Sequence, residues 1–409
     1  MKKIILIPNA TGPTNLGDHT MLEVLLDLIE STKGKKGIVI HTKNPELYEK
    51  KYVGKIVPSI YQYVALSNKN FIVSVARFIK ILIYVCLLKS RVRSFISSNR
   101  GDIAVKILDD YVHADVIIFA GGGYLRSQAD IKQALNLLLQ LVPFVIAKTC
   151  RGKIIVAPIS FGPFAYNWQG RLTAKILNGC DVVAAREEKS YKLMRSYGVK
   201  NLLLLNDLAL LVNKTKTIKK KNTIVGFTIR YWLRSRVQQE KLEFSYAQAL
   251  IRLSQRTGAT IQPIIQVASP DFPFEDDKEA VRRVYNHISD GHVPVSVPIK
   301  LKSVNHAAKV YGSLDLLLGM RMHSNILAAT QGVPFVAISY EHKTEGIARQ
   351  IGMGKYCISG EKVDKDNLFR LLMEAYTNRK QLKTQLTASV ESIRNNGISR
   401  WQSLLSKAN

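Results

Sequence analysis

The sequence predicts an α/β protein of two Rossmann-like domains that face a cleft, followed by a helical tail. Short apolar runs alternate with longer amphipathic stretches, which is typical of βαβ units around parallel sheets. This pattern stops at a polar, lysine-rich stretch near residue 213 and then starts again. The 409 residues are enough for two domains of about 150–200 residues each.

We expect the first domain over residues 1–212, a linker over 213–222, the second domain over 223–375 and the helical tail over 376–409. The tail is expected to break near Gly397. Two such domains and a tail describe a GT-B-like architecture. The predicted strands of the first domain are Ile4–Pro8, Gly37–His41, Asp115–Ala120, Lys153–Ile159, Val182–Ala185 and Leu202–Leu205. Those of the second domain are Thr223–Ile229, Thr260–Val267, Leu314–Leu318, Pro334–Ser339 and Tyr356–Ser359.

The chain is strongly basic, with a net charge of +28 and a pI near 9.9. Such a charge attracts nucleic acid, anionic lipid or phosphorylated substrates, although a solvated basic surface gives the same count. Aromatic residues make up only 8% of the chain, and the sequence has no nucleic-acid-binding motif, so we expect no nucleic acid partner. The four cysteines form no CxxC pair, and we expect no metal site.

One segment, near residues 71–93, breaks the domain pattern. Its run FIVSVARFIKILIYVCLL carries only Arg77 and Lys80 and is followed by KSRVR. The run is slightly short for a membrane span, but it fits a helix lying in the membrane interface with Lys89, Arg91 and Arg93 at anionic head groups. A helix buried in the first domain is the alternative. The apolar run at the N-terminus is too short for a signal peptide. We therefore expect a cytoplasmic protein, peripheral on the inner face of the cytoplasmic membrane.

Two loops in the first domain follow predicted strands. Asn15-Leu16-Gly17-Asp18 opens an amphipathic helix, where Asp18 is placed to cap the helix or to act in a site. The run Gly121-Gly122-Gly123-Tyr124-Leu125 follows the third strand, and its glycines allow close approach of a ligand or tight packing of the backbone. In open α/β sheets, ligands bind beyond the carboxyl ends of the strands.

The strongest candidate site lies in the stretch from Leu317 to Lys343. A buried strand ends at Gly319, and Arg321 and His323 flank the start of a helix. A helix N-terminus favours anions, and an arginine fork suits phosphate or carboxylate. His323 can transfer a proton near neutral pH, and Lys343 follows the next strand. This combination predicts an acidic, phosphorylated substrate.

These motifs together resemble those of the polysaccharide pyruvyl transferase family. The matching stretches are Asn15–Asp18, Gly121–Leu125, Ile159–Phe164, Ala185–Glu187 with Ser190, Arg321–His323, and Tyr340 with Lys343. The resemblance implies a GT-B-like fold, phosphoenolpyruvate as the donor substrate and a saccharide as the acceptor. It places Arg321 and His323 on the family's Arg-x-His motif.

From the motifs and the resemblance we assign each candidate residue a role. The catalytic residues are His323 and Arg321. The donor-binding residues are Arg321, Lys343, Ser324, Tyr340, Gly122 and Gly123. The residues assigned to the acceptor or the cleft are Asp18, Asn15, Tyr124, Arg186, Glu187 and Arg230.

The predicted reaction transfers the pyruvyl group of phosphoenolpyruvate to a saccharide and forms a pyruvate ketal in a cell-surface polysaccharide. The acceptor is expected to be carried on undecaprenyl diphosphate, on the side of the first domain. No cofactor is expected. The alternative function is a GT-B glycosyltransferase that uses a nucleotide-sugar, with Glu345 as the candidate ribose ligand.

Overall fold

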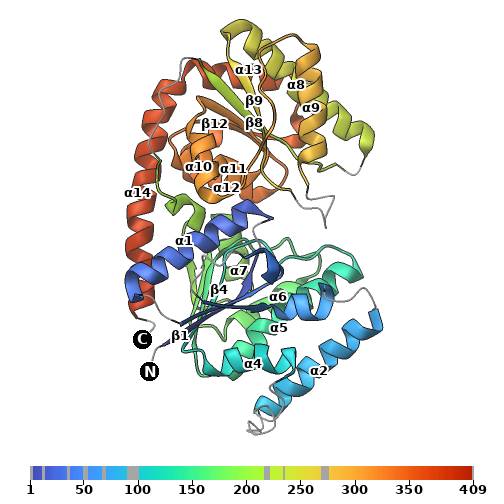
Figure 1. The fold of residues 1–409 in the computed structure, drawn as a ribbon, viewed down its shortest axis with the longest axis vertical. Coiled ribbons are helices and arrows are strands. Elements are labelled where there is room, and N and C mark those ends of the chain that lie inside the picture. Colours follow the sequence, from blue (N-terminus) through green and yellow to red (C-terminus); the bar gives the residue numbers. More distant parts are fainter. Residues whose placement is uncertain are drawn as a thin grey trace. The chain divides into compact units, whose positions relative to one another are not determined.

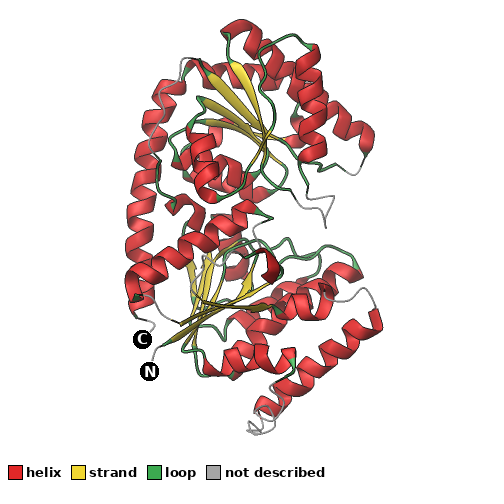
Figure 2. Cartoon of the chain, viewed as in Figure 1, coloured by secondary structure: helices red, strands yellow, loops and turns green. Residues whose placement is uncertain are grey.

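The structure is a computed structural model that describes residues 3–11, 14–34, 37–48, 54–66, 71–89, 101–215, 222–233, 235–268 and 276–407. The chain forms two compact units, and the trace and the element types are drawn in Figures 1 and 2. The first unit contains Met1–Pro13, Met21–Asp207 and Ser399–Asn409. The second unit contains Thr14–Thr20 and Leu208–Ile398, so the first turn of the first helix belongs to it.

The first unit is built on a parallel sheet of seven strands in the order β3-β2-β1-β4-β5-β6-β7. Its strands are β1 (Ile4–Ala10), β2 (Gly37–Thr42), β3 (Gly54–Pro58), β4 (Val116–Phe119), β5 (Lys153–Ile159), β6 (Val182–Ala185) and β7 (Leu202–Leu204). Its helices are α1 (Leu16–Lys33), α2 (Phe71–Lys89), α4 (Ile103–His113), α5 (Ile131–Thr149), α6 (Asn167–Leu177) and α7 (Glu188–Ser196).

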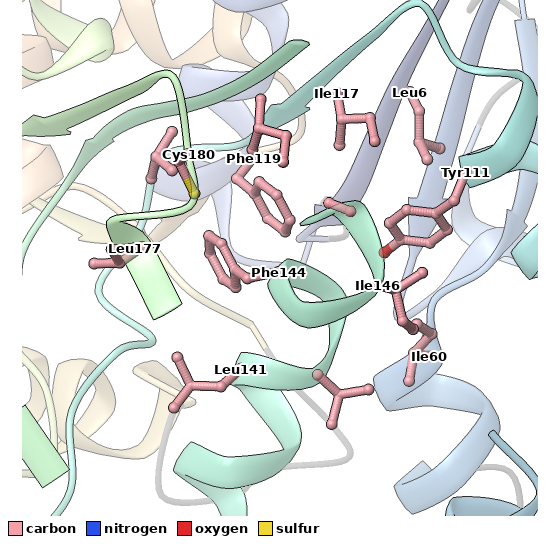
Figure 3. Packing of buried hydrophobic residues seen from close by; sticks show 14 of the residues in the cluster. Leu6, Ile60, Tyr111, Ile117, Phe119, Leu141, Phe144, Ile146, Leu177 and Cys180 are labelled. Atoms are coloured by element: carbon pink, nitrogen blue, oxygen red, sulfur yellow. The ribbon is translucent and has the colours of Figure 1, made fainter. Parts of the chain in front are cut away.

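The core of the first unit lies between the central strands and the helices α4 and α5. All four residues of β4 are buried, as expected for a strand covered on both faces. The rings of Phe119 and Phe144 stack with their centroids 3.7 Å apart and an interplanar angle of 8°. Figure 3 shows this stacked pair together with Tyr111 and Ile146.

The second unit is built on a parallel sheet of six strands in the order β10-β9-β8-β11-β12-β13. Its strands are β8 (Ile224–Thr228), β9 (Thr260–Ile265), β10 (Ile299–Lys300), β11 (Leu316–Gly319), β12 (Phe335–Ser339) and β13 (Cys357–Ser359). Its helices are α8 (Arg236–Thr257), α9 (Lys278–Asp290), α10 (Val304–Gly312), α11 (Met322–Thr330), α12 (His342–Gln350) and α13 (Lys365–Thr377), followed by α14 (Arg379–Ser406).

The C-terminal region is helical, as the sequence predicted, but the expected break near Gly397 is wrong. α14 continues through Gly397 to Ser406. A Cβ on Gly397 would lie 2.7 Å from Cδ2 of Leu211, so the glycine permits close packing of the helix. The last residues return to the first unit, where Lys153 Nζ donates a hydrogen bond to the carbonyl of Lys407 at 2.5 Å.

α2 has one buried side and one exposed side. Ile81, Tyr84 and Val85 are buried in the core of the first unit. Arg77 donates a hydrogen bond to the carbonyl of Tyr63, and Lys80 pairs with Asp102. The exposed residues among the described side chains of α2 are all apolar: Ile72, Val75, Ala76, Ile79, Leu82, Ile83 and Cys86.

The alternative of a fully buried helix at this position is therefore wrong. The predicted interfacial helix needs an exposed apolar side, and the described part of α2 has one. Arg91 and Arg93 lie outside the described residues. One described helix, α5, is long and apolar enough to cross a membrane, with 44% of its apolar window buried. This is weak evidence for a span, because α5 contributes Leu141 and Phe144 to the core.

Candidate functional site

The carboxyl edge of the second sheet collects the residues that the sequence singled out. β8 and β11 are neighbours, and the chain runs outward from them in opposite directions through β9 and β10 on one side and β12 and β13 on the other. Ligands of open parallel sheets bind at such a switch point, beyond the carboxyl ends of the strands. The residues that follow β8, β11 and β12 here are Arg230, Arg321, His323, Tyr340 and Lys343.

Arg321 is oriented by a carboxylate that the sequence did not reveal. It is the N-cap residue of α11, with φ −78° and ψ 125°. Its Nε lies 3.0 Å from Oδ1 of Asp277, and its Nη2 lies 2.6 Å from the same oxygen. Asp277 is fully buried and also accepts a hydrogen bond from the backbone of Val267 at 3.0 Å. Burial raises the pKa of Asp277, although Arg321 opposes this shift.

Three cations surround the phenol of Tyr340. Arg230 Nη1 donates a hydrogen bond to its hydroxyl at 3.1 Å, and the Arg230 guanidinium lies 5.0 Å from its ring centroid. Burial alone would raise the pKa of Tyr340, but Arg230, Lys343 and Arg321 outweigh it, so the pKa lies below its ordinary value. Lys343 Nζ lies 2.5 Å from a carboxylate oxygen of Glu341. Cations this close to one hydroxyl favour negative charge at this edge of the sheet.

His323 lies in the first turn of α11, against the first turn of α1. A Cβ on Gly17 would lie 2.1 Å from Nδ1 of His323, so only glycine fits there without a shift of the imidazole. The same turn is held to the second unit by an antiparallel bridge between Asn15 and Val267. The Asn15–Asp18 motif and the Arg321–His323 motif, far apart in the sequence, are therefore neighbours in the second unit.

Asp18 is not the N-cap of α1, so of its two expected roles the capping one is wrong. The helix begins at Leu16, so Asp18 lies inside the first turn. Its carboxylate accepts a hydrogen bond from Nδ2 of Asn15 at 3.0 Å. Its position in a helix's first turn is still favourable for a carboxylate, because it complements the positive end of the helix dipole.

Ser324 takes part in the packing of the second unit. Its side chain is fully buried, and its hydroxyl lies 2.8 Å from Oγ1 of Thr228 and 2.6 Å from the carbonyl oxygen of Arg321. Thr228 ends β8, and its carbonyl accepts a hydrogen bond from Tyr246 at 3.0 Å. These bonds attach the start of α11 to the end of β8, so Ser324 positions Arg321 and His323.

The glycine run lies at the switch point of the first sheet, between β1 and β4. A Cβ on Gly121 would lie 2.8 Å from the sulfur of Met21, which is consistent with tight packing. The carbonyl of Gly122 accepts a hydrogen bond from the backbone of Ser160 at 2.9 Å, and this bond extends the sheet. Gly123 and Tyr124 are half-buried, and the hydroxyl of Tyr124 donates to the carbonyl of Ala120 at 3.3 Å.

Arg186 and Glu187 form a buried network at the end of β6. Arg186 is 1% exposed; its Nη1 lies 2.8 Å from Oδ2 of Asp207, and its Nε donates to the hydroxyl of Ser160 at 2.7 Å. Glu187 is 2% exposed and accepts hydrogen bonds from Ser160 and Ser190. Arg186 and Glu187 are therefore buried inside the first unit and do not form a surface ion pair.

The comparison with known proteins identifies the family. The sequence model described as "Polysaccharide pyruvyl transferase" matches residues 15–342. The chain belongs to the polysaccharide pyruvyl transferase family. The matched range begins at Asn15 and includes every residue assigned a catalytic, donor or acceptor role except Lys343, which follows it directly. A curated relative, the amylovoran biosynthesis protein AmsJ of Erwinia amylovora, is 20% identical, and the alignment covers 96% of both chains.

Solved structures confirm the GT-B fold that the sequence predicted. The UDP-GlcNAc 2-epimerase of Neisseria meningitidis, bound to UDP-GlcNAc, has a TM-score of 0.57 at 9% identity and covers 100% of this chain and 99% of its own. The α,α-trehalose 6-phosphate synthase of Burkholderia multivorans has a TM-score of 0.56 at 10% identity and covers 100% of this chain and 98% of its own. At such identities the likeness concerns the fold alone.

Membership of the polysaccharide pyruvyl transferase family makes this protein a transferase enzyme. Within the part of the chain that the structure describes, no group of three or more His, Cys, Asp or Glu side chains could hold a metal ion. The side chains assigned to chemistry at the second sheet are mainly cationic, and they include His323. Asp277, which sequence reasoning missed, had one available signal: an Asp-Asp pair directly before the helix at Lys278.

Proposed function

We propose that this polysaccharide pyruvyl transferase moves the pyruvyl group of phosphoenolpyruvate to a saccharide and forms a cyclic ketal. The observation that supports this most directly is the convergence of Arg230, Arg321 and Lys343 around Tyr340, next to His323. Phosphoenolpyruvate carries a phosphate and a carboxylate, and both need cationic partners. Arginine forks suit these planar or multi-oxygen anions better than a point charge does.

The chemical step requires a proton donor beside the bound donor substrate. In the proposed reaction, His323 gives a proton to the methylene carbon of phosphoenolpyruvate, and C2 becomes electrophilic. One acceptor hydroxyl adds to C2, and its proton returns to His323. A second hydroxyl then forms the other C2–O bond as the C2–O bond to phosphate breaks, and its proton leaves with the phosphate. The cations hold the leaving phosphate, and no cofactor enters the proposal.

Phosphate release tests this function. The full chain is incubated with phosphoenolpyruvate and with glycan-bearing lipid extracts, and both inorganic phosphate and the mass of the saccharide product are measured. The proposal expects phosphate release that depends on the saccharide, with pyruvate attached to the product as a ketal. If a uridine-diphosphate sugar is consumed and phosphoenolpyruvate is not, the nucleotide-sugar glycosyltransferase replaces this function.

We also propose that the enzyme works on the inner face of the cytoplasmic membrane, with a lipid-linked acceptor such as a saccharide on undecaprenyl diphosphate. The support is the exposed side of α2, where Ile72, Ile79 and Ile83 are 76%, 49% and 52% exposed. Among the described side chains of α2, the two charged ones, Arg77 and Lys80, bond to the carbonyl of Tyr63 and to Asp102. The net charge of +28 favours approach to anionic lipid.

Flotation with anionic liposomes tests the membrane proposal. The double change Ile79→Asp and Ile83→Asp should abolish flotation while phosphate release with a water-soluble acceptor continues. Val237→Asp is the matched control, because Val237 is 74% exposed on α8 in the second unit. Equal flotation of the double variant and the control would remove α2 from the membrane contact.

A further inference from the structure

A hollow lies within the second unit, next to the side chain of Tyr340. It has a volume of about 510 Å³ and opens beyond the carboxyl ends of β12 and β13. Its walls include two aromatic side chains, Trp232 and Tyr340. Three carboxylates also line it, from Glu341, Glu345 and Glu361. Of the lining residues, only Tyr340 has a role in the proposed reaction, and Glu345 belongs to the alternative function.

The aromatic wall is held in a fixed place. The backbone N–H groups of Trp232 and Leu233 donate hydrogen bonds to Oε1 of Gln239 at 3.1 and 3.2 Å. Gln239 is 1% exposed, and its own amide donates to Glu243 at 2.8 Å. A Cβ on Gly360 would lie 2.8 Å from the Trp232 ring, so the indole also packs closely against the chain at this glycine. The indole is therefore positioned before any ligand arrives.

Two of the three carboxylates at the hollow are already paired with cations. Glu341 pairs with Lys343 and Glu345 with Arg349, and Lys362 also lines the hollow, so its walls carry little net charge. Carboxylates accept hydrogen bonds from hydroxyl groups, and an aromatic face covers apolar C–H surface. A neutral ring with hydroxyl groups on its edge and C–H groups on its face satisfies both kinds of wall.

We propose that this hollow binds one uncharged sugar ring of the acceptor saccharide, stacked on Trp232. The inference rests on the proposed function, because in that reaction the sugar ring supplies the hydroxyl groups that attack C2 of the donor. Tyr340 lines the hollow and also bonds Arg230, so a ring seated there has its hydroxyls next to the bound donor. This assigns part of acceptor binding to the second unit, whereas the sequence placed acceptor binding on the first domain.

Saturation-transfer NMR with methyl β-D-galactopyranoside, methyl β-D-glucopyranoside and methyl α-D-mannopyranoside tests the proposal on the full chain. At least one of the three should receive saturation at the C–H protons of one ring face. Trp232→Ala should weaken its affinity about tenfold, which corresponds to about 1.4 kcal/mol, because the sugar loses its aromatic contact. Trp168→Ala is the matched control, because Trp168 is 46% exposed on α6 of the first unit, and it should leave the signals intact.

Three results would overturn the sugar site. These are no saturation transfer to any of the three glycosides, signals of equal size in Trp232→Ala and wild type, or displacement of the glycosides by uridine diphosphate. Calorimetry with phosphoenolpyruvate on the same samples separates this inference from the proposed function. Donor binding without glycoside signals refutes the sugar site alone, whereas Trp232-dependent glycoside signals without donor binding refute the pyruvyl transfer alone.

Discussion

The carboxyl edges of the two sheets share a topology but differ in charge. In both sheets the chain turns outward from two central neighbours, β1 and β4 in the first unit and β8 and β11 in the second. At the first edge, Arg186 lies buried between Asp207 and Glu187, which leaves one negative charge in excess. At the second edge, Arg230, Arg321 and Lys343 exceed the carboxylates of Asp277 and Glu341 by one positive charge.

This difference shows that the order of the strands determines where a ligand binds, and that the side chains at that place determine which charge the ligand carries. An arginine placed after a strand is not by itself a ligand. Arg186 is 1% exposed and stabilises its own unit, whereas the Arg321 side chain is 11% exposed and lies at an edge that stabilises anions. If this is right, substitutions at the second edge should change turnover or donor binding, and substitutions at the first edge should change stability.

The largest expected effect is on turnover, from His323→Ala. General acid–base catalysis commonly contributes about 10²–10⁴-fold, so kcat should fall by that order. The affinity for phosphoenolpyruvate should change much less, which a comparison of kcat with calorimetric Kd measures. Near-native kcat together with a lowered melting temperature would assign His323 a purely structural role.

At the first edge, Arg186→Met should act on stability. It leaves the buried carboxylates of Asp207 and Glu187 without their cation, and breaking a buried pair in this way costs about 3–5 kcal/mol. Chemical denaturation measures the loss. Lys192→Met is the control, since its pair with Glu188 is exposed on α7 and should contribute less than about 1 kcal/mol. A stable Arg186→Met protein that no longer binds saccharide would show that Arg186 takes part in substrate binding.

A smaller effect is expected from Gly17→Ala. The new methyl group would meet His323 at 2.1 Å, so the imidazole must move and kcat should fall by about tenfold, because small misplacements of catalytic groups are costly. Gly101→Ala is the matched control, since a methyl group there meets no described atom within 4 Å. Equal kcat for both variants would show that the first turn of α1 does not position His323.

The smallest effect concerns the ionisation of Tyr340. Burial raises its pKa, but Arg230, Lys343 and Arg321 lower it below the ordinary value. A bound trianion offsets these cations, so phosphoenolpyruvate should raise the pKa of Tyr340, and donor affinity should fall as the pH rises through the pKa of the free enzyme. The tyrosinate absorbance of wild type minus Tyr340→Phe, with and without donor, reports this. If phosphoenolpyruvate does not change the titration of Tyr340, the donor substrate binds away from this tyrosine.

Sequence periodicity predicted the central strands well because each is an apolar run covered on both faces. β5 and β6 begin and end where the sequence placed them. The periodicity did not predict β3 and β10. These are edge strands with few buried residues, and their sequences are GKIVP and IK. Edge strands carry a weaker apolar pattern because they pack on fewer neighbours.

The motifs of the site could be found in the sequence, but the contacts between them could not. Asp277 lies 44 residues before Arg321 and holds its guanidinium only because α9 and α11 begin at the same edge of the sheet. The contact of Gly17 with His323 joins the two ends of the family match. No local pattern records either pairing, since both depend on the order of the strands.

The measurement that tests the central claim most directly is calorimetric titration of the chain with phosphoenolpyruvate. Arg321→Ala alone would leave the buried carboxylate of Asp277 without its cation. The sharper variant therefore combines Arg321→Gln with Asp277→Asn. It is compared with Arg230→Gln and with Lys343→Gln. Arg236→Gln is the control, because Arg236 is exposed and pairs only within α8 with Glu240 among the described contacts. The account predicts saturable donor binding by wild type and control, weakened by about 1.5–3 kcal/mol in each site variant. Donor affinity that is the same in all five proteins would contradict it.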